Sequence, residues 1–258
     1  MFHPQRIVCL TEETTEWLYL LGAEDRIVGI SAYTERPPRA KQEKPVVSAF
    51  IGGSVQKIKA LEPDLIIGFS DVQADLARDL IRENLQVFIT NQRSVTDILN
   101  QLLLLGRMIG AGDRAEKIVK EYRERIDSLR RAASERKVRP RVYFEEWDDP
   151  MISAIHWVSE LIGIAGGQDI FADRASGAAS RERHVRTEEV IDRAPDIYIS
   201  CWCGKPLDRQ SVLDRPGFDR LPAIQNDRIY EMDPAIILQP GPACLTDGLD
   251  ALLGMIND

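Results

Sequence analysis

The stretch from Phe144 to Trp157, FEEWDDPMISAIHW, brings together residue types that could do chemistry. It contains two of the chain's four tryptophans, one of its three histidines, and four carboxylates. Carboxylates beside an imidazole could ligate a metal, or could act as a general acid and base. The indole rings could instead form the wall of a site for a large, flat ligand.

The metal hypothesis would use Glu145, Glu146, Asp148, Asp149 and His156. Transition-metal sites usually gather several histidines or thiolates from different elements, and this chain has only three histidines. No calcium-binding D-x-D-x-D-G loop occurs. The four cysteines lack C-x-x-C pairs and are too few for a disulfide scaffold. We therefore expect free thiols and no metal held by the protein itself.

The enzyme hypothesis has no motif to support it. The chain contains no G-x-S-x-G elbow, no H-E-x-x-H, no G-x-x-x-x-G-K-[ST] loop and no G-x-G-x-x-G after a strand. We therefore expect a protein that is not an enzyme. A cytoplasmic α/β metalloenzyme or metallochaperone stays open as the alternative from another class. It would use Glu146, Asp149, His156 and Cys203 as ligands or as acid and base groups.

Charge and hydropathy narrow the range of partners. The 258-residue chain has a formal charge of −8 and a pI of about 5.1, which argues against nucleic acid and anionic membranes as partners. No apolar run reaches the ~20 residues that span a bilayer, and no signal peptide is visible before the first strand. Either a targeting segment was removed or the protein stays in the cytoplasm. We expect a monomer.

Apolar strands alternate with amphipathic helices along the whole chain, which is typical of parallel sheets covered by helices. We therefore expect an α/β fold of two Rossmann-like lobes with mostly parallel sheets. The predicted strands are residues 6–10, 26–30, 64–69, 86–90, 141–145, 196–200 and 228–232.

A single long helix is predicted between the two lobes. Its apolar residues recur at spacings of three and four from Asp113 to about Lys137, and at about 1.5 Å per residue it would be roughly 40 Å long. The expected division is an amino-terminal lobe over 1–110, the helix over 111–138, and a carboxyl-terminal lobe over 139–258.

The second lobe repeats the first. QKIKALEPDLIIGFS (56–70) and EEVIDRAPDIYISCW (188–202) align without gaps as a helix, a Pro-Asp turn and a strand. Because ligands bind outside the carboxyl ends of parallel strands, loops of both lobes should line one cleft. The residues expected to contact a ligand there are Tyr33, Phe50, Phe69, Trp147, Asp149, His156, Trp157, Trp202 and Cys203.

Seven segments, in their order along the chain, resemble one protein family. They are RIVCLTEETTEWLYLLGAEDRIVGIS, SVQKIKALEPDLIIG, EEWDDPMISAIHW, LIGIAGGQDIF, TEEVIDRAPDIYIS, SCWCGK and LPAIQNDRIYEMDP. Over nearly its whole length the chain resembles the class III substrate-binding proteins of ABC importers for vitamin B12 and iron siderophores. EEWDDPMISAIHW and SCWCGK are similar to the cobalamin-binding branch.

The resemblance implies a bilobed protein of the periplasm or cell envelope without an intrinsic cofactor. Such a protein captures a corrinoid, cobalamin above all, and delivers it to permease subunits; an iron-siderophore or heme-type chelate is the alternative ligand. By motif position, Tyr33 and Phe50 fall where the family places aromatic contacts to the corrin. The family also carries one acid on each lobe that pairs with permease arginines. Glu188 matches the second acid, whereas the first position is Gln56, a neutral residue that would remove one charge-assisted contact.

Overall fold

The computed structural model describes residues 3–177 and 179–258. By its internal contacts the chain divides into two compact units. The first unit comprises Met1–Gln92, Thr96–Glu121 and Gln239–Pro242, and the second comprises Arg93–Val95, Tyr122–Leu238 and Ala243–Asp258. Within the described part of the chain, no helix combines the length and the apolar character needed to cross a bilayer.

The first unit is built on a five-stranded sheet with the order β3-β2-β1-β4-β5, and every pair of neighbouring strands is parallel. Its strands are β1 (Ile7–Cys9), β2 (Ile27–Ser31), β3 (Val46–Ser48), β4 (Leu65–Phe69) and β5 (Val87–Thr90). The helices of this half are α1 (Glu12–Leu20), α2 (Ala40–Glu43), α3 (Val55–Ala60), α4 (Ala74–Arg82) and α5 (Val95–Met108).

The core of the first unit explains why these segments become strands. All three residues of β1 are fully buried, and β4 is buried along its whole length. A strand covered on both faces needs a continuous apolar run, and RIVCL and LIIGF supply it. Val8 and Ile66 pack with Ile58 of α3 and Leu80 of α4, so helices cover this sheet through their apolar faces.

The second unit has a mixed five-stranded sheet. Its main order is β10-β9-β6-β7, and β8 pairs with β6. The strands are β6 (Arg141–Asp148), β7 (Met151–Ser153), β8 (Gln168–Asp169), β9 (Ile197–Ser200) and β10 (Ile229–Glu231). The helices are α7 (His156–Ile164), α8 (Thr187–Arg193), α9 (Arg209–Leu213), α10 (Pro222–Gln225), α11 (Pro234–Ile237) and α12 (Leu249–Asn257).

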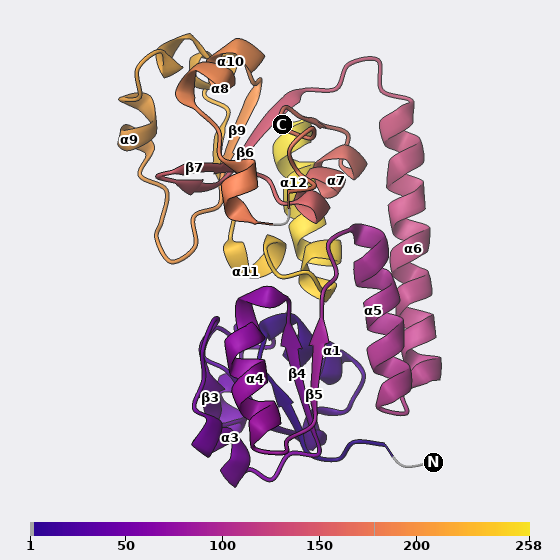
Figure 1. Ribbon diagram of the computed structural model, residues 1–258. Helices are drawn as coiled ribbons and strands as arrows, with labels where there is room; N and C mark the ends of the chain where they lie inside the picture. Colours follow the sequence, from indigo (N-terminus) through magenta and orange to yellow (C-terminus); the bar gives the residue numbers. More distant parts are fainter. Residues whose placement is uncertain (1–2, 178) are drawn as a thin grey trace. The chain divides into compact units, whose positions relative to one another are not determined.

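The long helix is α6 (Gly112–Ser134), and it runs from the first unit into the second. Its first turns lie beside α5 (Figure 1), where a Cβ added at Gly106 would stand 2.2 Å from the Cβ of Ala115. Only glycine permits that approach. The predicted α/β fold and its single long helix are confirmed. The seven predicted strands correspond to β1, β2, β4, β5, β6, β9 and β10, whereas the short strands β3, β7 and β8 were not predicted.

The opening stretch forms a β-hairpin followed by a helix, and its first strand extends beyond the predicted end at residue 145. β6 continues past Glu145 to Asp148, the chain turns at Asp149 and Pro150, and β7 returns antiparallel to β6. Trp147 therefore lies within a paired strand, opposite Ile152. Pairing of the hairpin gives this tryptophan a fixed backbone, which a loop would not provide.

Candidate ligand-binding edges of the two sheets

The carboxyl edge of the first sheet carries exposed apolar side chains. Tyr33 follows β2 and is 54% exposed, and Phe50 follows β3 and is 43% exposed. Ile51, in the loop after β3, and Val72, in the short 3-10 helix after β4, are also exposed large hydrophobic residues at this edge. Phe69, the last residue of β4, is buried. An aromatic pair held open to solvent among apolar neighbours is the kind of surface that a partly apolar ligand covers.

A buried glutamine, Gln73, ties three strand ends of this edge together. Its amide oxygen accepts a hydrogen bond from the backbone N–H of Phe69 (2.9 Å), and its Nε2 donates to the carbonyls of Phe50 (2.8 Å) and Leu10 (3.2 Å). The loop that carries Phe50 is thereby fixed to the ends of β1 and β4. Sequence reasoning missed Gln73, because a lone glutamine beside an amphipathic helix has no distinguishing pattern.

On the second sheet, Trp147 is the aromatic residue of the opening stretch that remains partly exposed. Its Nε1 donates to the carbonyl of Asp149 at 2.9 Å, across the hairpin turn. Asp149 and Cys203 are exposed. His156 is the first residue of α7, its side chain is 40% exposed, and its Nε2 lies 3.9 Å from Glu160. These four residues leave polar and aromatic surface open at this edge.

Trp157 and Trp202 lie in the core of the second unit. Trp157 is 2% exposed and donates through Nε1 to the carbonyl of Ile237 at 3.0 Å. Trp202 is 3% exposed and donates to Glu145 at 3.1 Å. Both indoles thus have their polar atom satisfied internally and expose almost no surface to solvent.

Glu145 is the centre of a buried polar network. Its carboxylate is fully buried and accepts two hydrogen bonds from Arg215, at 2.6 and 2.9 Å. Tyr143 and Tyr198 donate their hydroxyl hydrogens to it at 2.9 and 2.6 Å, and Trp202 completes the shell. Burial, followed by the charge of Glu145, raises the pKa of both tyrosines well above the ordinary value, so both remain donors at neutral pH.

Arg215 keeps its charge inside this network. Burial alone lowers the pKa of a guanidinium, but here the hydrogen bonds and the charge of Glu145 outweigh it and raise that pKa. The guanidinium of Arg215 therefore stays charged at every accessible pH. The geometry of its pair with Glu145 is the bidentate fork that suits arginine and carboxylate.

Two further acids of the opening stretch, Glu146 and Asp148, also have cationic partners. Glu146 accepts two hydrogen bonds from the buried Arg183, at 2.5 and 3.0 Å, and Asp148 pairs with Lys205 at 2.6 Å. Within the described residues, no group of three or more histidine, cysteine, aspartate or glutamate side chains is placed to hold a metal ion. Three of the four carboxylates that suggested a metal site, those of Glu145, Glu146 and Asp148, are thus paired with cationic side chains of the protein.

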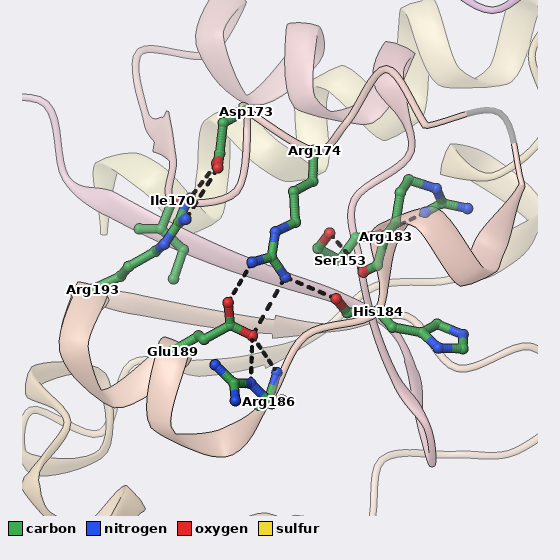
Figure 2. Close-up of polar contacts among 9 residues, drawn as sticks. All are labelled: Ser153, Ile170, Asp173, Arg174, Arg183, His184, Arg186, Glu189 and Arg193. Atoms are coloured by element: carbon green, nitrogen blue, oxygen red, sulfur yellow. Dashed lines mark hydrogen bonds and ion pairs between the residues drawn. The ribbon is translucent and has the colours of Figure 1, made fainter.

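The two positions that resemble permease-docking acids lie on exposed helix surfaces. Gln56 is exposed in α3, and Glu188 is exposed in the first turn of α8. The neighbouring Glu189 is held between Arg174 and Arg186 (Figure 2). Hydrogen bonding from Arg174 contributes most to lowering the pKa of Glu189 to about 2. Of the two adjacent acids, Glu188 is thus the one left accessible on this helix.

The chain thus has two α/β units that share one long helix, with exposed Tyr33 and Phe50 at the carboxyl edge of the first sheet and partly exposed Trp147 at the edge of the second. A model of the periplasmic binding protein family matches residues 7–236. The chain belongs to this family of binding proteins. It is therefore a protein that binds a solute without transforming it. The family predicted from the sequence is confirmed.

The chain aligns with individual relatives over most of its length. The chain is 24% identical over 249 residues to a vitamin B12-binding protein of Vibrio parahaemolyticus, covering 93% of this chain and 86% of that protein. It is 22% identical over 258 residues to an ABC transporter substrate-binding lipoprotein of Bacillus subtilis, covering 96% and 79%. A periplasmic heme-binding protein of Pseudomonas aeruginosa has the same fold, with a TM-score of 0.83 at 22% identity over 98% of this chain and 92% of that one.

Proposed function

We propose that this protein captures a corrinoid, cobalamin above all, and passes it to an ABC importer in the cell envelope. The observation that carries the proposal is the set of accessible aromatic residues at the two strand-end edges, Tyr33, Phe50 and Trp147. Flat, partly apolar faces of a macrocycle are bound by such rings. The B12-binding relative supports this choice of ligand, and the substrate-binding lipoprotein supports the choice of an importer as partner.

Charge pairing at the second edge favours a corrinoid over a dianionic ligand. Arg215, Arg183 and Lys205 all lie at or behind this edge, and each is paired with a carboxylate of β6. A ligand with two carboxylates, such as heme, would need cations that are not already neutralised, because burying an unpaired charge is costly. The amide-rich periphery of a corrinoid can instead be met by polar groups and by the exposed Asp149.

The first test is a titration with cyanocobalamin followed by tryptophan fluorescence. We expect saturable quenching in the wild type. Trp147→Ala and Tyr33→Ala should each weaken binding about 10-fold to 100-fold, because a partly buried aromatic anchor contributes ~1 to 3 kcal/mol. Leu104→Ala is the matched control: it removes an exposed apolar side chain of α5, away from either edge, and should leave the affinity unchanged.

A heme-type chelate is the second candidate, and one observation favours it. Tyr33 and His156 are both accessible and both carry groups that can serve as axial ligands to iron. Hemin and a ferric siderophore should therefore be titrated in parallel with cyanocobalamin. Saturable binding of hemin that is lost in Tyr33→Phe or His156→Gln, together with no response to any corrinoid, would transfer the assignment to heme.

The importer contact can be tested with a charge change in each direction. We propose that Glu188 docks against a permease arginine and that Gln56 occupies the equivalent place on the first unit. With a cobalamin importer in lipid nanodiscs, Glu188→Gln should weaken binding about 10-fold, and Gln56→Glu should strengthen it by a similar factor, since each changes one charge-assisted contact. Equal binding by all three proteins would remove both residues from the docking surface.

A further inference from the structure

Lys205 occupies an aromatic cage on the second unit. Its ammonium nitrogen lies 4.7 Å from the ring centroid of Trp147 and 4.9 Å from that of Trp202. The same nitrogen lies 2.6 Å from the carboxylate of Asp148. Two indole faces and one carboxylate around a cation are the elements of a recognition site for an ammonium group.

The walls of this cage are held in place independently of the lysine. The Nε1 of Trp202 donates to the buried Glu145, and the Nε1 of Trp147 donates to the carbonyl of Asp149. Asp148 ends β6 and is paired with Met151 across the hairpin. Lys205 itself follows Gly204, whose φ of +82° gives the loop after β9 its turn. The cage would therefore persist if the lysine side chain were removed.

An ordinary surface ion pair would not need this arrangement. The Lys205 side chain is 40% exposed, and Asp148 alone would satisfy its charge. The second and third contacts, to two different indoles, restrict the long side chain to one path and desolvate one side of the ammonium. Because Trp147 is partly exposed, the lysine also fixes which part of that ring remains open at the ligand edge.

We infer that Trp147, Trp202 and Asp148 form a binding site for a primary alkylammonium group, and that Lys205 is its resident occupant. By filling the site, Lys205 acts as a positioning residue for the Trp147 indole and excludes free amines from this edge. The ammonium site stands on its own geometry, whereas the effect on ligand affinity rests on the proposed function.

The experiment replaces the lysine by a free amine. Lys205→Ala removes Cγ, Cδ, Cε and Nζ, which are the atoms of n-propylammonium. Adding n-propylammonium chloride should change the tryptophan fluorescence of Lys205→Ala saturably in the millimolar range. The wild type and Lys205→Met, whose thioether fills the cage without a charge, should respond no more than they do to equal sodium chloride. Asp148→Asn in the Lys205→Ala background should weaken the response at least ~10-fold.

A second measurement uses the wild type alone. Lys205 should react more slowly than the exposed Lys57 with an amine-acetylating reagent, as quantified by mass spectrometry of the two peptides. Failure of Lys205→Ala to bind the amine, an equal response from the wild type, or equal acetylation of the two lysines would each overturn the assignment.

A third measurement tests whether Lys205 affects the affinity for cyanocobalamin. Lys205→Ala should bind cyanocobalamin about 10-fold more weakly than the wild type, and n-propylammonium should restore most of the loss. Restoration by the amine distinguishes positioning of Trp147 from a general loss of structure. If the amine binds but no variant, including the wild type, binds a corrinoid, the ammonium site stands and the proposed ligand falls.

Discussion

Replacing Arg215 with methionine should lower the free energy of unfolding by about 3 to 5 kcal/mol. The reason is that the variant leaves the fully buried carboxylate of Glu145 without its cation, while Tyr143, Tyr198 and Trp202 supply only neutral donors. Methionine keeps much of the side-chain volume beside Phe218, over whose ring the guanidinium of Arg215 now lies at 5.3 Å. Chemical denaturation monitored by tryptophan fluorescence measures the loss.

The control is Arg209→Met, which breaks the exposed pair of Arg209 and Asp227 in the same unit. That change should cost no more than ~1 kcal/mol, because exposed ion pairs are screened by water. Adding Glu145→Gln to Arg215→Met should restore part of the stability, because a neutral amide no longer needs a cation. The amide oxygen can still accept from Tyr198 and Trp202, and the amide NH2 can donate to the hydroxyl oxygen of Tyr143. If Arg215→Met and Arg209→Met lose the same free energy of unfolding, leaving the buried Glu145 carboxylate without its cation does not destabilise the protein, and the account of the network is wrong.

The main strands and the long helix α6 follow from local patterns of apolar residues, which is why they could be predicted from the sequence. Strands such as RIVCL and DLIIGF are continuous apolar runs, and α6 has a long heptad-like apolar stripe, so neither depends on distant partners. The strands that were missed are three residues long or shorter, namely β3, β7 and β8. Such strands are defined by the neighbour to which they bond, which a single sequence does not display.

The side chains of the site depend on contacts that are distant in sequence. Trp202 and Trp147 each come two residues after a predicted strand, 196–200 and 141–145 respectively. Both were therefore predicted to contact the ligand. Trp202 nonetheless lies in the core because its indole N–H meets Glu145. Nothing in SCWCGK indicates that partner, nor that Arg215 would neutralise it. Aromatic residues at strand ends could be predicted as a group, but which of them face solvent is decided by buried polar groups elsewhere in the unit.

The first unit contains a buried acid that should make stability depend on pH. Glu13, in the first turn of α1, is 4% exposed, and Thr11 donates to its Oε1 at 2.6 Å. Among the described residues, no group hydrogen-bonds its Oε2. Gly241 packs so closely that a Cβ there would stand 2.4 Å from the Cβ of Glu13. Burial is the main cause that raises the pKa of Glu13 from 4.5 to about 7, and the nearby charge of Glu16 adds to it.

The sign of the effect follows from linkage. A carboxyl group whose pKa is higher in the folded state binds more protons when folded, so stability is retained below pH 4.5 and lost as the pH rises towards 7. The difference between 4.5 and about 7 corresponds to about 3 kcal/mol. Glu13→Gln keeps the shape and removes the titration. The variant should therefore match the wild type near pH 4.5 and exceed it by about 3 kcal/mol above pH 7.

Urea denaturation of both proteins at pH 5, 6, 7 and 8 isolates Glu13, because every other titrating group cancels in the difference. Glu35→Gln is the matched control: it neutralises an exposed acid of the same unit, paired with Lys41, and its difference from the wild type should stay flat. If the difference in unfolding free energy between Glu13→Gln and the wild type is also independent of pH, the buried carboxyl is ionised at little cost. Water or a rearrangement near Gly241 would then supply the missing hydrogen-bond donor. A difference that grows with pH would instead show that Glu13, packed against Gly241, is protonated in the folded protein at acidic pH, because a buried ionised carboxylate without a donor on Oε2 costs more than the neutral acid.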